Sequence, residues 1–310
     1  MAVLRLCGFV LTFLVAFGAI AQDNSEDLVR LGFFPPMDED IVFRIQSVQE
    51  HSFRGNRRRA EWTHELHLRL TGEEPPDMLT GSFSIRSVRA VENVERDVAY
   101  LFARAIEDET YPFNMLRAGA PVEIDWARVK VRFAQRLPGL TDPATAAAIE
   151  RLLPVFEPDG VGAVMRPLWI TSVAHLRPFR RDATWLVAEG LDLPAWFFVP
   201  GSKLETYGGR EEGSEDLLFV WRITPDPQAA RDTLAPELAS LVAQAGGPDV
   251  PDAEAVVAQA TAEGMSVVEG GIATYDPTPG LMRTVEFEAR LGAGDITRRV
   301  EIRIERLKPE

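Results

Sequence analysis

The segment His64-Glu65-Leu66-His67 has the residue types that come nearest to a metal site in this sequence. In the zinc motif H-E-x-x-H, two histidines four residues apart lie on one face of a helix. Here the histidines are three apart, and the alternating apolar and polar residues around them predict a β-strand, on which they would point to opposite faces. We therefore expect His64 to be a core or rim residue, His67 to be solvated, and no metal or other cofactor to be bound.

Other signatures of catalysis are absent from the sequence. It contains no G-x-S-x-G or S-x-x-K motif, no phosphate-binding loop, and no cysteine beyond Cys7. The acidic pairs Glu211-Glu212 and Glu215-Asp216 lack the alternating oxygen ligands of a calcium loop and are typical of a hydrated surface. The sequence thus predicts no catalytic residue, and a hydrolase with an unrecognised site stays open as an alternative.

Aromatic residues give the better indication of a binding site, because they are concentrated between residues 169 and 221. The candidate binding residues are Trp185, Trp196, Phe197, Phe198 and Trp221. Such side chains line ligand pockets but also fill cores, and both interpretations stay open. If the middle three lie on a strand, Trp196 and Phe198 share one face and Phe197 takes the other.

The composition is that of a globular protein, with 46% hydrophobic and 26% charged residues in a chain of 310. Acidic residues outnumber basic ones by 47 to 33, which gives a net charge of −14. Nucleic-acid binders usually carry the opposite balance or a basic patch, so we expect no nucleic-acid partner.

Residues 1–21 have the features of a cleaved secretory signal peptide. Arg5 precedes an apolar run from Leu6 to Phe17, and Ala19-Ile20-Ala21 matches an A-x-A cleavage site. The run is shorter than the roughly 20 residues of a membrane-spanning helix. We therefore expect a periplasmic or secreted mature chain, cleaved near Ala21, with no transmembrane span and, once Cys7 is removed, no disulfide.

Alternating apolar residues predict strands near both ends of the chain. Near the N-terminus, Ile41–Gln46 and Trp62–Leu70 form an expected hairpin, and a third strand at Phe83–Val88 slips in phase near Ser87, as at a bulge. Further strands are expected at 217–221, where a continuous apolar run favours burial on both faces, and at 267–275, 284–291 and 299–305.

Helical periodicity and capping residues predict helices in the middle of the chain, at 92–107, at 126–137, from 143 onward after the cap at Asp142, and within 226–263. The glycine-rich, acidic segment Glu205–Asp216 is expected to be an exposed loop. These features predict an α+β fold, with an antiparallel sheet formed by N- and C-terminal hairpins and a helical middle inserted. After a polar tether at 22–40, residues 41–308 are expected to form a single interleaved domain, with a candidate sub-boundary near 140–155.

Three groups of residues resemble signal-peptide-bearing proteobacterial proteins of unknown function. They are Tyr111-Pro112-Phe113, the pattern Gly119-x-Pro121-Val122-x-Ile124-Asp125-Trp126, and Tyr275-Asp276-x-x-x-Gly280 followed by two alternating strands. The resemblance implies secretion and an α+β composition, and it implies no reaction, cofactor or catalytic residue.

Taken together, the sequence favours a non-enzymatic periplasmic or secreted protein that binds an apolar ligand or an envelope partner protein. Two alternatives remain: an envelope hydrolase with an unrecognised site, and a scaffold or accessory envelope component without a small ligand.

Overall fold

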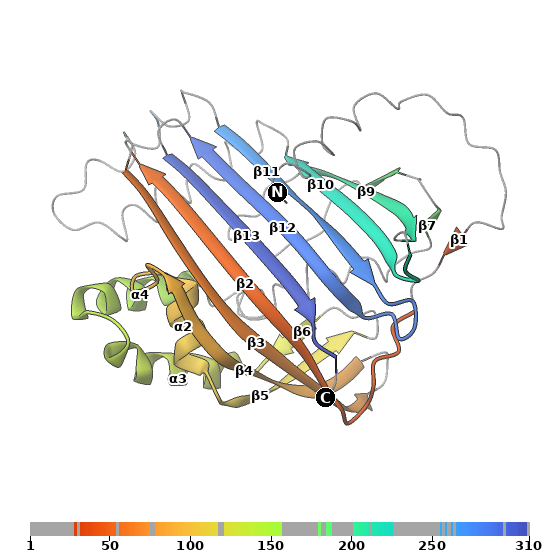
Figure 1. The fold of residues 1–310 in the computed structure, drawn as a ribbon. Helices are drawn as coiled ribbons and strands as arrows, with labels where there is room; N and C mark the ends of the chain where they lie inside the picture. Colours follow the sequence, from red (N-terminus) through yellow and green to blue (C-terminus); the bar gives the residue numbers. More distant parts are fainter. Residues whose placement is uncertain are drawn as a thin grey trace.

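A curved antiparallel sheet of 11 strands dominates the structure (Figure 1). This computed structural model describes residues 28–29, 32–53, 56–74, 78–116, 121–156, 179–180, 184–187, 201–210, 213–225, 255, 258, 262, 265–293 and 296–308. The predicted helical segment 226–263 therefore lies almost entirely outside the described residues, and so does most of 155–182.

The strand order across the sheet is β6-β5-β4-β3-β2-β13-β12-β11-β10-β9-β8. The strands are β2 (Asp40–Phe53), β3 (Asn56–Glu74), β4 (Met78–Glu92), β5 (Thr110–Leu116), β6 (Pro121–Ile124), β8 (Thr184–Val187), β9 (Gly201–Arg210), β10 (Leu217–Pro225), β11 (Met265–Tyr275), β12 (Met282–Ala293) and β13 (Ile296–Arg306). The N-terminal and C-terminal strands meet at the centre of the sheet, where β2 pairs with β13 along its length.

The predicted α+β fold with an inserted helical middle is wrong, because the middle of the chain adds strands to the same sheet. The strands β8, β9 and β10 extend one side of it beyond β11, and β5 and β6 extend the other side beyond β4. The physical reason is that a strand edge leaves backbone groups unpaired, so the outer strands of both terminal hairpins recruit further strands. The expected loop Glu205–Asp216 shows this, since its first half belongs to β9.

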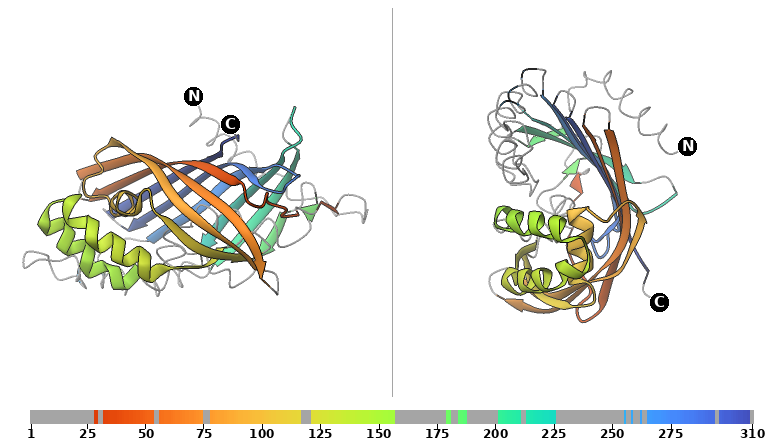
Figure 2. Two further views of the ribbon diagram at one scale, coloured as in Figure 1. Left: turned by 90° about the horizontal axis from the view of Figure 1, so that it is seen from below. Right: turned by 90° about the vertical axis from the view of Figure 1, so that its left-hand side faces the viewer.

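Few and short helices accompany the sheet in the described residues: α2 (Val98–Ile106), α3 (Trp126–Arg136), the 3₁₀ turn η3 (Leu137–Gly139) and α4 (Pro143–Phe156). Figure 2 shows the sheet curving around these helices, which lie beside its β2–β6 part. Each begins at an aspartate, as expected for helix N-caps: Asp97 accepts from Tyr100 N–H at 2.9 Å, and Asp142 accepts from two backbone N–H groups at 3.0 Å.

The two faces of the sheet differ in chemistry. We call the face turned toward α2 and α3 the inner face and the opposite one the outer face. Along β2, Ile41, Phe43 and Ile45 are buried on the inner face, and their neighbours on β3 and β13 continue the same core. Ala103, Ile106 and Val129 of α2 and α3 belong to that core, so it joins the helices to the sheet. The run Leu217–Trp221 follows this alternation, with its odd-numbered residues buried and the others partly exposed; the expected burial on both faces is wrong.

The bulge predicted near Ser87 is confirmed. The pairing of β3 with β4 shifts at His64, which faces both Ser87 and Val88, and Ser87 has a φ of 54°. Glu107, at the end of α2, accepts a hydrogen bond from Val88 N–H at 2.8 Å and pairs with Arg104. The bulge thus supplies the donor that attaches α2 to the sheet.

The N-terminal segment is attached to the sheet at several points. The short strand β1 (Leu28–Val29) pairs with β7 (Phe179–Arg180), and Phe34 N–H donates to Pro279 O at 2.8 Å. Gly280 has a φ of 79°, and a Cβ atom there would overlap the carbonyl oxygen of Gly32. The turn between β11 and β12 therefore requires glycine for two independent reasons.

Candidate functional site

An aromatic patch covers the inner face of β10, β11 and β12. Its members, Phe219, Trp221, Tyr275 and Phe287, are all buried, at 7% exposure or less. The rings of Phe219 and Tyr275 meet edge to face, with centroids 5.3 Å apart. Aromatic pairs of this geometry contribute about 0.5–1.5 kcal/mol beyond the burial of their area, so the patch is a firmly packed surface.

Glycine makes room for the largest ring of this patch. Trp221 lies opposite Gly271 on β11, and a Cβ atom on Gly271 would come within 2.5 Å of the Trp221 ring. The indole therefore lies directly over the backbone of β11. A glycine inside a strand is a signal of such a close approach, and Gly270-Gly271 was the feature of the sequence that could have located it.

The predicted binding residues are only partly within the described structure. Trp221 is buried in the aromatic patch. Trp185 belongs to β8, and the register places it in one row across the sheet with Glu205 of β9 and Trp221 of β10. Trp196, Phe197 and Phe198 lie outside the described residues, so their expected alternation stays a prediction.

The inner face changes from apolar to polar toward the end of β2. Beyond Ile45, the inward residues of β2 are Ser47, Gln49 and His51. His51 lies between Arg58 of β3 and Arg298 of β13, each of which is its direct cross-strand neighbour. We call Arg58, His51 and Arg298 the basic row.

The basic row is held at the N-terminal end of α2. Arg298 donates to Gln49 Oε1 at 3.3 Å, and its charge also acts on Asp97, the N-cap of α2. Burial raises the pKa of Asp97, while the N–H of Tyr100 and the charge of Arg298 act in the opposite direction. His51 keeps contact with solvent, yet desolvation of its ring and the two arginines lower its pKa to about 4. His51 is therefore neutral at pH 7.

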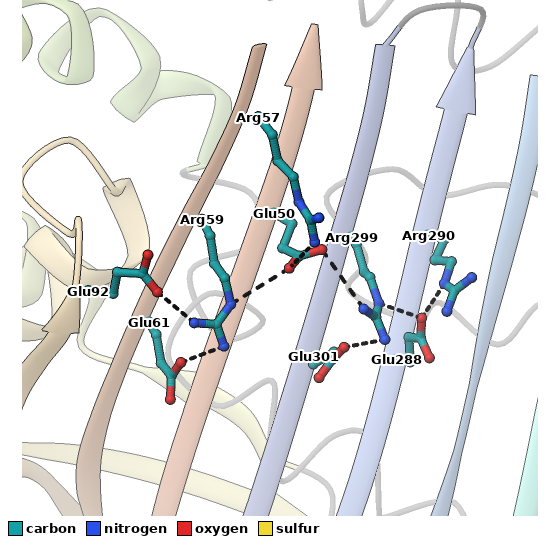
Figure 3. A network of polar contacts seen from close by, with 9 residues as sticks. All are labelled: Glu50, Arg57, Arg59, Glu61, Glu92, Glu288, Arg290, Arg299 and Glu301. Carbon is teal, nitrogen blue, oxygen red and sulfur yellow. Dashed lines mark hydrogen bonds and ion pairs between the residues drawn. The ribbon is translucent and has the colours of Figure 1, made fainter. Parts of the chain in front are cut away.

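The outer face carries a network in which charges are matched (Figure 3). Arg59 pairs with Glu61 and Glu92 at 2.6 Å each, and Arg57 pairs with Glu50 at 2.7 Å. Arg299 pairs with Glu288 at 2.8 Å and with Glu301. Exposed ion pairs of this kind contribute about 0–1 kcal/mol each. The matched charges indicate a solvated face of the sheet.

His64 and His67 lie on opposite faces, as the strand geometry requires. His64 is on the inner face beside Trp62, and its Nδ1 is buried without a hydrogen-bond partner; burial lowers its pKa to about 4. His67 is on the outer face, where its Nε2 lies 3.5 Å from Glu65. Neither nitrogen of His67 makes a hydrogen bond within the described part of the chain. Within that part there is also no group of three or more His, Cys, Asp or Glu residues placed to hold a metal ion.

The basic row was missed in the sequence because its members are distant along the chain. Arg58 and Arg298 stand within the runs Arg57-Arg58-Arg59 and Arg298-Arg299, which look like surface charge. Strand alternation predicts that the residues of each run divide between the two faces. Only the pairing of β13 with β2 brings Arg298 next to His51.

No family model matches the chain, and no curated protein matches its sequence. Three solved structures show weak likeness. Lipovitellin, described for its lipid–protein interactions, has 7% identity and a TM-score of 0.40 over 88% of this chain and 25% of its own. DynF from the dynemicin biosynthesis pathway of Micromonospora chersina has 8% identity and a TM-score of 0.19, over 94% and 95%. Ail, the attachment invasion locus protein of Yersinia pestis, has 5% identity and a TM-score of 0.14, over 87% and 99%.

The chain spans about a quarter of the length of lipovitellin. None of these likenesses is strong enough to bear on function. Among the helices of the described residues, none combines the length and the apolar character that a membrane crossing needs.

Proposed function

We propose that this protein is a non-enzymatic component of the periplasm or of the secreted fraction, and that it binds an apolar ligand on the inner face of its sheet. The observation that carries this proposal is the distribution of apolar side chains over that face. The core cluster continues from β2–β5 to β10–β13, whereas the described helices lie beside the β2–β6 part.

The aromatic patch is the part of this face best suited to an apolar ligand. Aromatic and aliphatic walls with few polar groups are typical of small-molecule sites. The polar groups of the same face are gathered at the other end of β2 and β13, in the basic row. The leader at 1–21 and the cleavage motif ending at Ala21 support a location outside the cytoplasm.

The hydrolase alternative would need a histidine within reach of a carboxylate and a hydroxyl. His64 does not meet this requirement, since its Nδ1 has no hydrogen-bond partner. His175, the other candidate for such a site, lies outside the described residues. The proposal of a binding protein therefore takes precedence.

The test is binding of an apolar fluorescent probe, N-phenyl-1-naphthylamine, to the full mature chain. We expect saturable binding that weakens at least fivefold in Trp221→Leu. The matched control is Val268→Ala, which removes an apolar side chain from the outer face of β11, where Val268 is 42% exposed. Thermal melting checks that both variants fold, and native mass spectrometry of protein from its own host identifies any retained ligand. Absence of probe binding by the folded wild type would refute the proposal.

A further inference from the structure

The runs of consecutive arginines divide between the two faces of the sheet. Arg57 and Arg59 point to the outer face, where glutamates pair with both. Arg58, between them, points to the inner face and faces His51. The same division occurs on β13, where Arg299 pairs with glutamates and Arg298 faces His51 from the other side.

The inner arginines lack the matched surroundings of the outer ones. No carboxylate within the described part of the chain lies within ion-pair distance of Arg58, which is exposed. Arg298 shares the field of one carboxylate, Asp97, which also caps α2. Like charges placed opposite one another on neighbouring strands are destabilising, so the two arginines disfavour a protonated His51 between them. In a chain with a net charge of −14, this row is a local concentration of positive charge.

The spacing of the row suits a single anionic group. Arg58 and Arg298 belong to β3 and β13, which are separated by β2 alone. Neighbouring strands are about 4.8 Å apart, so the two backbones are about 10 Å apart, within reach of two long guanidinium side chains that converge on one anion. Guanidinium groups bind carboxylate and phosphate oxygens through paired hydrogen bonds.

Apolar side chains continue from this row along the same face. Next to Arg298 on the inner face of β13 come Val300, Ile302 and Ile304, and Phe287 of β12 lies opposite Ile302. From Phe287 the same register row leads to Gly271 and then to Trp221 in the aromatic patch. A molecule that places its charge at the basic row therefore meets an apolar surface along the rest of its length.

We propose that the ligand of the inner face is an amphiphile with an anionic head group, a carboxylate or a phosphate, held between Arg58 and Arg298 at the end of β2, with its apolar tail lying toward the aromatic patch. This inference rests on the proposed function, since it names the chemical class of the ligand for the same face. It assigns to Arg58 and Arg298 a role in ligand selection that the outer arginines do not share.

The test compares three probes in competition with the naphthylamine dye: decyl phosphate, its neutral counterpart decanol, and inorganic phosphate. For the wild type we expect decyl phosphate to displace the dye at a concentration at least tenfold lower than decanol. Inorganic phosphate should leave the dye bound. In Arg58→Gln the two decyl compounds should become equal, with the affinity for decanol unchanged.

The matched control is Arg57→Gln, which removes the same charge one residue away and on the outer face. It should keep the tenfold preference for decyl phosphate. An equal loss in Arg57→Gln and Arg58→Gln would mean that overall charge sets the preference, and it would overturn the inference. Displacement by inorganic phosphate alone would overturn the assignment of an amphiphile.

The outcomes separate the two proposals. If decanol and decyl phosphate displace the dye equally from the wild type, the head-group inference fails and the apolar-ligand function stands. If neither the dye nor either decyl compound binds to the folded protein, the proposed function itself fails.

Discussion

Replacement of His64 by leucine should make the protein more stable and less sensitive to acid. The imidazole lies on the inner face beside Trp62, opposite Ile45 and the Ser87 bulge, and its buried Nδ1 has no hydrogen-bond partner. A buried polar group without a partner is destabilising. Leucine has a similar size and no polar atom, so it should fit between the neighbouring apolar residues.

The dependence on pH follows from the lowered pKa of His64. Burial lowers this pKa from 6.5 to about 4, so the unfolded chain takes up a proton at His64 as the pH falls below 6.5, while the folded protein does not. Stability is lost wherever the unfolded state binds more protons, here from pH 6.5 down to about 4. Since one pKa unit corresponds to 1.36 kcal/mol, we expect His64 to account for a loss of about 2 kcal/mol between pH 7.5 and pH 5.

Urea unfolding at pH 7.5 and pH 5 measures this loss in the wild type and in His64→Leu. Carboxylates titrate in both proteins, so the difference between the two losses isolates His64. The control is His67→Gln, on the outer face, which retains His64 and should lose as much stability as the wild type. Equal losses in the wild type and in His64→Leu would refute the interpretation that burial holds the ring neutral.

Three further substitutions test how the sheet is built. Gly280→Ala should lower the free energy of unfolding by about 3 kcal/mol through backbone strain and overlap with the N-terminal segment, whereas Gly213→Ala, with a φ of 76° and open space around it, should show the backbone strain alone in the same thermal melts. Gly271→Ala should displace the indole of Trp221, seen as a shift in tryptophan emission and a lower melting temperature. Asp276→Asn should cost about 2 kcal/mol in urea unfolding, because the carboxylate of Asp276 bonds to two partly buried arginines.

Local features of the fold could be predicted where a short stretch of sequence determines them. The alternation around Trp62 and Ile302 gives the strands and their inner face, and the phase slip near Ser87 gives the bulge. Asp142 marks the start of α4 because its side chain satisfies the first N–H groups of that helix. In each case the deciding interactions lie within a few residues of one another or within one hairpin.

The order of the strands could not be predicted, because the pairing between them is not local. Residues 204–210 looked like a loop on account of their glycines, yet they form β9 beside β10. The register shift between Leu218 and Phe219 places one extra residue, Gly208, in β9. The glycine thus marks a bulge inside a strand, which has the same local composition as a loop.

One of the patterns noted in the sequence has a structural explanation. In Tyr275-Asp276-x-x-x-Gly280, the tyrosine is buried in the aromatic patch and the glycine adopts the left-handed conformation at the turn. The aspartate binds Arg283 and Arg306, at 3.4 and 2.9 Å. These roles stabilise the turn between β11 and β12, and they require no ligand.

The candidate site was hidden from the sequence for a related reason. A run such as Arg57-Arg58-Arg59 predicts only that its middle member points away from the other two. Whether that member meets a glutamate or another base depends on the two neighbouring strands, one of which is about 240 residues away along the chain. On the outer face the register brings arginines to glutamates, and on the inner face it brings Arg58 and Arg298 to one histidine. Since both arrangements arise from the same strand pairing, their opposite charge balance is a property of the face, and the inner face is the one with a positive charge to offer a ligand.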